Sequence, residues 1–226
     1  MSNQSNPKDF VTPDMSDIDE ARIDTLMRGA VDLHVHSGPS VMPRQLDHLA
    51  ALEEAFAEVK RGRAASVWIE GEAGAGKSAL LRRFLGGLGG EVVVLRGRCY
   101  PREALPYKGL DAAVDGLADQ LRRWPDDEVA ALVPSGAAPL LALFPVLGRV
   151  PRLRGARRPV GYEQAQLRVE AFAALRALLG AIARRRPLVL ALDDLQWSDE
   201  EGVALLEELL RPPAPVPMLF VASRRP

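Results

Sequence analysis

The chain has 226 residues, 47% of them hydrophobic, so it can bury the core of one sizeable domain with a small appendage. A formal net charge of −1 gives no reason to expect nucleic acid or a membrane surface as a direct partner. One cysteine, Cys99, excludes an internal disulfide and a cysteine-rich zinc site, and no apolar run reaches the roughly 20 residues that cross a bilayer. These features, with no secretion signal at the polar N-terminus, predict a cytoplasmic protein.

Residues 1–43 are predicted to form an extension that precedes the main domain. The extension begins with a polar stretch that favours disorder, and a short helix is predicted at 16–28. The alternation of apolar and polar residues that follows predicts a strand with His34 and His36 on one face. A stretch rich in glycine and proline then marks the boundary with the main domain.

The H-x-H pattern of this strand could hold a metal, because two imidazoles two residues apart can share one ion. The segment DLHVHS resembles the first strand of amidohydrolase-type and PHP-type metal hydrolases, where such a sequence supplies the first two ligands. Those sites take further ligands from later strands of a barrel, whereas here only His48 remains and no barrel pattern follows. We interpret the segment as a leader or as the stump of a different protein, and a metal hydrolase built on His34 and His36 is the third-ranked hypothesis.

The main domain, expected over 44–226, opens with a predicted helix and then a stretch that carries most of the chemistry. That stretch, SVWIEGEAGAGKSALLRRFL at 66–85, reads as a short strand, a G-x-x-x-x-G-K-S loop and an apolar helical pattern. Glycines let the loop curl so that its N–H groups point at one phosphate, and the following helix adds its positive end. Lys77 is then expected to reach the β- and γ-phosphates of ATP, and Ser78 to ligate Mg²⁺. The expected nucleotide-binding residues are Gly71, Glu72, Ala73, Gly74, Ala75, Gly76, Lys77, Ser78 and Ala79.

Beyond the loop, residues 91–99 (EVVVLRGRC) predict a second strand, parallel to the first. A large helical insertion is expected over 100–186, because no strand pattern appears there. Within it, residues 137–147 are apolar on all sides, which indicates either burial in this chain or cover by a partner. Three other helices of the insertion are predicted at 107–123, 126–133 and 163–184.

An uninterrupted apolar run at 187–194 (PLVLALDD) predicts a strand that is buried on both faces and ends in two carboxylates. This is the form of a Walker B element, in which Asp193 holds Mg²⁺ and Asp194 orients or polarises the attacking water. We expect the Lys77 loop and these acids to lie on neighbouring strands, because they share one nucleotide.

A helix is predicted at 200–210 and a fourth strand at 216–223 (VPMLFVAS), with two arginines at its end. In this kind of domain a polar or basic group at that place commonly senses the γ-phosphate. We assign this role to Arg225 in preference to Arg224.

From about residue 49 to its end, the chain resembles the AAA-type, STAND-class ATPase module of large bacterial signalling proteins. The segments that carry the resemblance are HLAALEEAF, GEAGAGKS, RGRCYPREALPYKGLDAAVDGL, LALDDLQWSDEEG and LFVASRRP. The resemblance implies an α/β fold, a P-loop NTPase three-layer sandwich with a mainly parallel sheet. Family members carry G-R-E where this chain has VMPRQLD, and they continue into a fifth strand and a helical lid. The comparison therefore implies a core truncated before those elements, with weak or impaired turnover.

Two functions of different classes follow from the main domain. The first is a Mg²⁺-dependent, ATP-binding and slowly ATP-hydrolysing signalling switch, whose partners are ATP or ADP and either another protein or a covalently linked output domain. The second is a non-catalytic scaffold, with or without a nucleotide, in which the apolar residues around 140–147 dock a partner or a sister subunit of a homo-oligomer.

Overall fold

The computed structural model describes residues 31–34, 48–101, 106–107, 109–154 and 161–226. Its strands form one five-stranded sheet with the order β1-β2-β5-β4-β3, and every neighbouring pair is parallel. The strands are β1 (Val31–His34), β2 (Ala65–Glu70), β3 (Val93–Arg98), β4 (Leu188–Asp193) and β5 (Leu219–Arg224). Because all strands run the same way, their carboxyl ends lie along one edge of the sheet.

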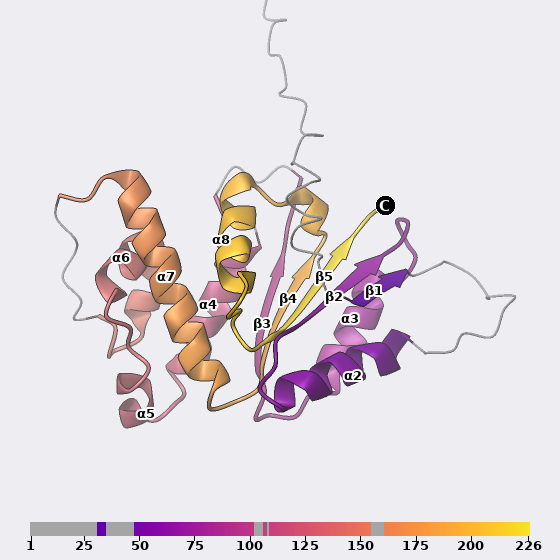
Figure 1. Ribbon diagram of the computed structural model, residues 1–226, viewed down its shortest axis with the longest axis horizontal. Helices are drawn as coiled ribbons and strands as arrows, with labels where there is room; N and C mark the ends of the chain where they lie inside the picture. The colour runs from indigo at the N-terminus through magenta and orange to yellow at the C-terminus, as the bar shows by residue number, and fades with distance from the viewer. Residues whose placement is uncertain (1–30, 35–47, 102–105, 108, 155–160) are drawn as a thin grey trace, which may run out of the picture.

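Helices cover both faces of the sheet, as the apolar runs of the central strands require. Successive residues of β4 and β5 enter two different hydrophobic clusters, one on each face. One face is covered by α2 (His48–Lys60) and α3 (Lys77–Gly86), and the other by α4 (Leu110–Leu121), α7 (Gln164–Ala183) and α8 (Glu200–Leu210) (Figure 1). This confirms the predicted three-layer α/β sandwich with a parallel sheet.

The helical insertion lies between β3 and β4 and consists of α4 to α7, with α5 at Asp126–Ala130, α6 at Ala137–Leu143 and the 3₁₀ helix η1 at Pro145–Arg149. Figure 1 shows α6 beside α7, on the side of α7 away from the sheet. Leu140, Phe144 and Leu147 are buried in the cluster that also contains the inner face of α7. The buried side chains of the apolar stretch at 137–147 are therefore packed inside this chain, and docking of a partner around 140–147 stays a prediction.

The N-terminal segment contributes a strand to the same sheet. β1 pairs in parallel with β2, with Val31 beside Val67 and His34 beside Glu70. The sheet thus takes in residues on both sides of the boundary expected near residue 43, where a separate extension was predicted. His36 and the helix predicted at 16–28 lie outside the described residues.

Two features of the described residues bear on other functions. They contain no group of three or more His, Cys, Asp or Glu side chains placed to hold a metal. None of the helices in the described ranges is both long enough and apolar enough to span a bilayer.

Candidate nucleotide-binding site

The loop that follows β2 has the curled backbone that the G-x-x-x-x-G-K-S sequence predicts. Gly74 and Gly76 have φ values of 83° and 93°, in the left-handed region that residues other than glycine rarely adopt. No atom lies within 4 Å of a Cβ built on either glycine, so the backbone conformation alone explains why glycine is needed. α3 begins immediately afterwards at Lys77, with its amino end at the loop.

Lys77 is buried, although it carries a charge. Its Nζ donates hydrogen bonds to the carbonyl oxygens of Gly71 at 2.5 Å and Glu72 at 2.9 Å. The Lys77 amine is therefore held over the loop by hydrogen bonds to two carbonyl groups at the start of the same loop. Burial of a charge in this way is costly unless it is compensated, and a phosphate would compensate it more strongly than two carbonyls.

The acidic strand β4 ends at the same edge of the sheet as the loop. The sequence predicts that β4 and β2 are neighbouring strands. That prediction is wrong, because β5 lies between them. In register, Ile69 of β2 stands beside Ser223 of β5, and Arg98 of β3 stands beside Asp193 of β4. Ser223 is fully buried, and its hydroxyl donates to Asp193 Oδ1. The intervening strand therefore supplies a polar contact that orients the carboxylate.

Ser78 and Asp193 line one cleft of about 610 Å³ between α3 and the ends of β3 and β4. A hydroxyl and a carboxylate are the hard oxygen donors that Mg²⁺ prefers, and this ion takes only one or two protein ligands beside phosphates and water. The Asp193 oxygen that Ser223 does not contact is available to such an ion. The residues present therefore fit the expected metal, with two protein ligands and not three.

Asp194 directly follows β4 and has a left-handed backbone conformation, with φ of 58° and ψ of 45°. This conformation is uncommon for residues other than glycine, and it turns the chain away from the strand direction. Its N–H donates to Ser223 Oγ at 2.9 Å. Its Oδ2 accepts from Arg98 Nε at 3.1 Å and from a second guanidinium nitrogen at 2.9 Å, and its Oδ1 accepts from Gln196 at 3.2 Å. The pKa of Arg98 is raised, chiefly by this hydrogen bond.

The two arginines after the β5 core have different surroundings. Arg224 forms an ion pair with Glu70, the last residue of β2, and its guanidinium lies 5.6 Å from the Trp68 ring centroid. Arg225 is exposed at the carboxyl edge of the sheet. Arg224 thus links β5 to the strand that enters the loop, whereas Arg225 has the freer side chain.

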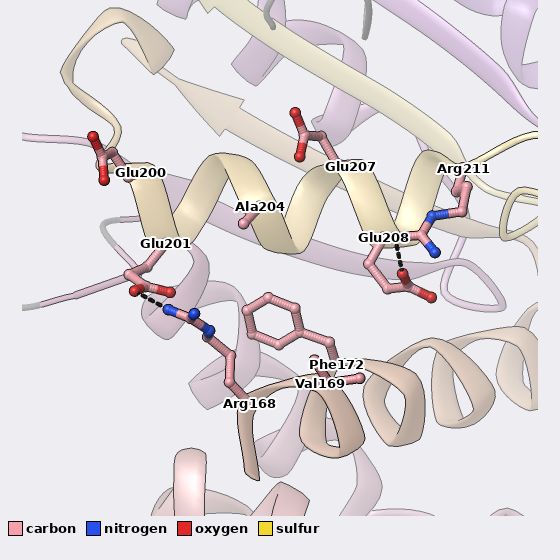
Figure 2. A pocket seen from close by; sticks show the side chains of 9 residues that line it. All are labelled: Arg168, Val169, Phe172, Glu200, Glu201, Ala204, Glu207, Glu208 and Arg211. Atoms are coloured by element: carbon pink, nitrogen blue, oxygen red, sulfur yellow. Dashed lines mark hydrogen bonds and ion pairs between the residues drawn. The ribbon is translucent and has the colours of Figure 1, made fainter. Parts of the chain in front are cut away.

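A second hollow, of about 570 Å³, lies between α7 and α8 and contains none of the predicted nucleotide-binding residues. Figure 2 shows Arg168 of α7 pointing to Glu201 of α8, with Phe172 between the two helices. Arg176 of α7 likewise pairs with Glu208 of α8 at 3.0 Å. Its ion pairs join α7 to α8, so this hollow is a feature of helix packing.

The site contains residues that sequence reasoning did not single out, and Arg98, Ser223 and Glu70 are the main ones. Each is a polar residue within or directly at the end of an otherwise apolar strand, and this position was the available signal. Their partners lie far away in the sequence, Arg98 and Asp194 being 96 residues apart, so the contacts themselves were not readable.

A parallel sheet with helices on both faces, a curled glycine loop after one strand and an acidic strand end at the same edge define a P-loop type of nucleoside triphosphatase fold. The chain belongs to the AAA ATPase domain family, whose model matches residues 45–221. An uncharacterized protein of Rhizobium meliloti (strain 1021) is 32% identical over 174 residues. The match covers 74% of this chain but only 17% of that protein, so the chain spans a small part of the relative's length.

Proposed function

We propose that the chain is a Mg²⁺-dependent module that binds ATP, hydrolyses it slowly and acts as a signalling switch of the STAND class. The observation that carries the proposal is the single cleft lined by Ser78, from the helix after the glycine loop, and by Asp193, from the end of β4. A nucleoside triphosphate on the loop would present its β- and γ-phosphates to this cleft. Membership of the AAA ATPase domain family supports nucleotide binding. The Ser78 hydroxyl and the Asp193 carboxylate support Mg²⁺ binding.

Within this function, residues 71–79 hold the phosphates through backbone N–H groups and the amino end of α3. Lys77 turns from the loop carbonyls to the β- and γ-phosphates, and Ser78 and Asp193 hold Mg²⁺. When bound, Mg²⁺ neutralises charge on the phosphate oxygens.

Asp194 positions or polarises the attacking water, and Arg225 senses the γ-phosphate. Both residues follow strands that end at the carboxyl edge, β4 and β5 respectively. Arg98 donates twice to Asp194 Oδ2 and Gln196 donates once to Oδ1, so the carboxylate keeps one acceptor position for water. Competition between these protein donors and water supports slow turnover.

The switch role requires that the nucleotide state reaches another part of the protein. The helical insertion is the element that would relay it, since α4 begins beside the end of β3. The great length of the Rhizobium meliloti relative beyond the matched region supports a covalently linked output domain in the parent protein.

Nucleotide binding is tested by titration calorimetry with MgATP on the wild type and on Lys77→Ala. We expect the variant to bind at least about 100-fold more weakly, because a buried charge-assisted contact with the phosphates is lost. Lys60→Ala is the matched control, since it removes the same group from the end of α2. Equal affinity in the wild type and Lys77→Ala would contradict the proposal.

Hydrolysis is tested separately by phosphate release. Asp194→Asn keeps the size of the side chain but removes the carboxylate, so it should bind MgATP like the wild type and release no phosphate. A wild type that binds MgATP but shows no turnover at high protein concentration would instead indicate the non-catalytic scaffold.

A further inference from the structure

The segment LQWSDEEG, at 195–202, carries the resemblance to signalling ATPases, but apart from the Gln196 contact with Asp194 it has no part in the proposed chemistry. In the structure it is the short connection from the acidic end of β4 to α8. Residues Leu195–Trp197 form a 3₁₀ turn, η2, in which the Trp197 N–H donates to the Asp194 carbonyl at 3.0 Å. The Ser198 N–H then donates to the Leu195 carbonyl at 2.9 Å, and Ser198 is buried. The turn is thus a compact link between Asp194 and Asp199.

That residue, Asp199, holds two elements at once with its two carboxylate oxygens. Its Oδ1 accepts the N–H of Gly202 at 2.9 Å and caps α8. Its Oδ2 accepts the N–H of Tyr107 at 2.7 Å, from the segment that leads into α4. A helix cap needs only one acceptor, and serine or asparagine serves as well as aspartate there. The second bond, to a backbone 92 residues away, is specific to this fold.

Tyr107 has a backbone that needs such a restraint. Its φ of 65° is uncommon for a residue other than glycine and carries a conformational cost. Its carbonyl accepts the N–H groups of Leu110 and Asp111 at 2.9 and 3.0 Å, so its conformation starts α4. Its ring packs against Phe144 and Phe172, with centroids 5.3 and 5.9 Å away, and burial raises its pKa to about 12. Tyr107 therefore connects Asp199 to the core of the helical insertion.

The same segment also touches the end of β3. A Cβ on Gly97 would lie 1.7 Å from the Gly109 carbonyl oxygen, so glycine is required at position 97 for the two backbones to meet. The next residue, Arg98, pairs with Asp194. The start of α4 is thus held between β3 on one side and Asp199 on the other. Asp199 follows Asp194 by five residues, and Arg98 at the end of β3 is tied to Asp194 by its ion pair.

We propose that Asp199 is a positioning residue that fastens the start of the helical insertion to the end of β4, so that a change of nucleotide at Asp193 and Asp194 is transmitted to α4 and α7. The route runs through η2 to Asp199, then to Tyr107 and its aromatic partners. The Arg168–Glu201 ion pair joins α7 to the first turn of α8 (Figure 2). The transmission rests on the proposed function, whereas the fastening does not.

The test is hydrogen exchange of the peptides that cover 106–121 and 200–210, in the wild type and in Asp199→Ser. Serine keeps the cap of α8 but is too short to hold Tyr107 as well. Without nucleotide, the amides of Tyr107, Leu110 and Asp111 should exchange about tenfold faster in the variant, with α8 nearly unchanged. Asp199→Asn has one acceptor oxygen, and when that oxygen caps α8 its NH₂ group faces the Tyr107 N–H, so the same amides should exchange at least as fast as in Asp199→Ser. Glu200→Gln, at the neighbouring exposed position, should match the wild type.

The second arm adds a slowly hydrolysed ATP analogue with Mg²⁺. In the wild type, exchange in α4 should change at least about threefold, whereas Asp199→Ser should bind the analogue equally well and show no change in α4. An equal α4 response in both proteins, or unchanged exchange at Tyr107 in the first arm, would overturn the inference. A wild type that binds no nucleotide would defeat the proposed function and the transmission, while the first arm would still decide the fastening.

Discussion

Asp194, the residue proposed to position the attacking water, also has contacts that hold the fold together. A water-positioning carboxylate needs a free acceptor position, and here Arg98 donates twice to Oδ2 while Gln196 donates once to Oδ1, which leaves one position for water. The Arg98 side chain is about half exposed, so its pair with Asp194 is screened by solvent and can break at small cost. The pair is therefore suited to restrain Asp194 reversibly.

We predict that Arg98→Gln raises the rate of phosphate release about three- to tenfold with little change in MgATP affinity. Glutamine removes the charge that holds the Asp194 carboxylate, which then turns more readily to water. Phosphate release and calorimetry measure the two effects separately. The double variant with Asp194→Asn should be inactive, and a rate as low as that of Asp194→Asn in the single variant would mean that Arg98 takes part in catalysis.

Among the elements, α6 and η1 show why an apolar stretch need not be a docking surface. Residues 137–147 have no polar face, yet α6 is enclosed by α7 on one side and continues into η1, which packs near α4. A helix that is apolar all round is expected to be buried, and here the long helix of the same insertion provides the cover.

We predict that Leu140→Ala lowers the free energy of unfolding by about 2–5 kcal/mol, the usual cost of a cavity left by a fully buried leucine. Leu141→Ala, at a partly buried position of the same helix, should cost less. Urea unfolding followed by circular dichroism measures both. Loss of self-association in Leu140→Ala without loss of stability would instead favour the docking surface.

For the whole molecule, the proposed nucleotide cleft lies where several strands end, so a nucleotide bound there would tie together the loop after β2, α3 and the end of β4. A ligand that binds only the folded state stabilises it in proportion to its affinity and concentration. Thermal unfolding therefore reports on the site without requiring turnover.

We predict that MgATP at about 100 times its dissociation constant stabilises the wild type by about 2.7 kcal/mol. For a domain of this size that corresponds to a rise of about 5–10 °C in the melting temperature. Lys77→Ala, if it binds about 100-fold more weakly, should gain about 0.4 kcal/mol at the same concentration and rise by no more than about 2 °C. An equal rise in both proteins would place the nucleotide elsewhere on the molecule.

The element boundaries differ from the predictions where a distant contact intervenes. A helix was predicted from residue 107, but α4 begins at Leu110, because Tyr107 is held at positive φ by Asp199. The strand predicted to run through residue 194 stops at Asp193, because the following N–H turns to Ser223. Both partners lie in other elements, so periodicity could not reveal them.

The amino-acid sequence by itself determined the glycine loop with Lys77 and Ser78, the apolar strand that ends at Asp193, and the α/β class, because these depend on residues adjacent in the chain. Only the tertiary structure decided that β5 separates the two motif strands and places Ser223 against Asp193. It also decided that Arg98 meets Asp194 and that Asp199 meets Tyr107. Strand order and such pairings depend on how all the apolar faces pack together, and local patterns do not contain that information.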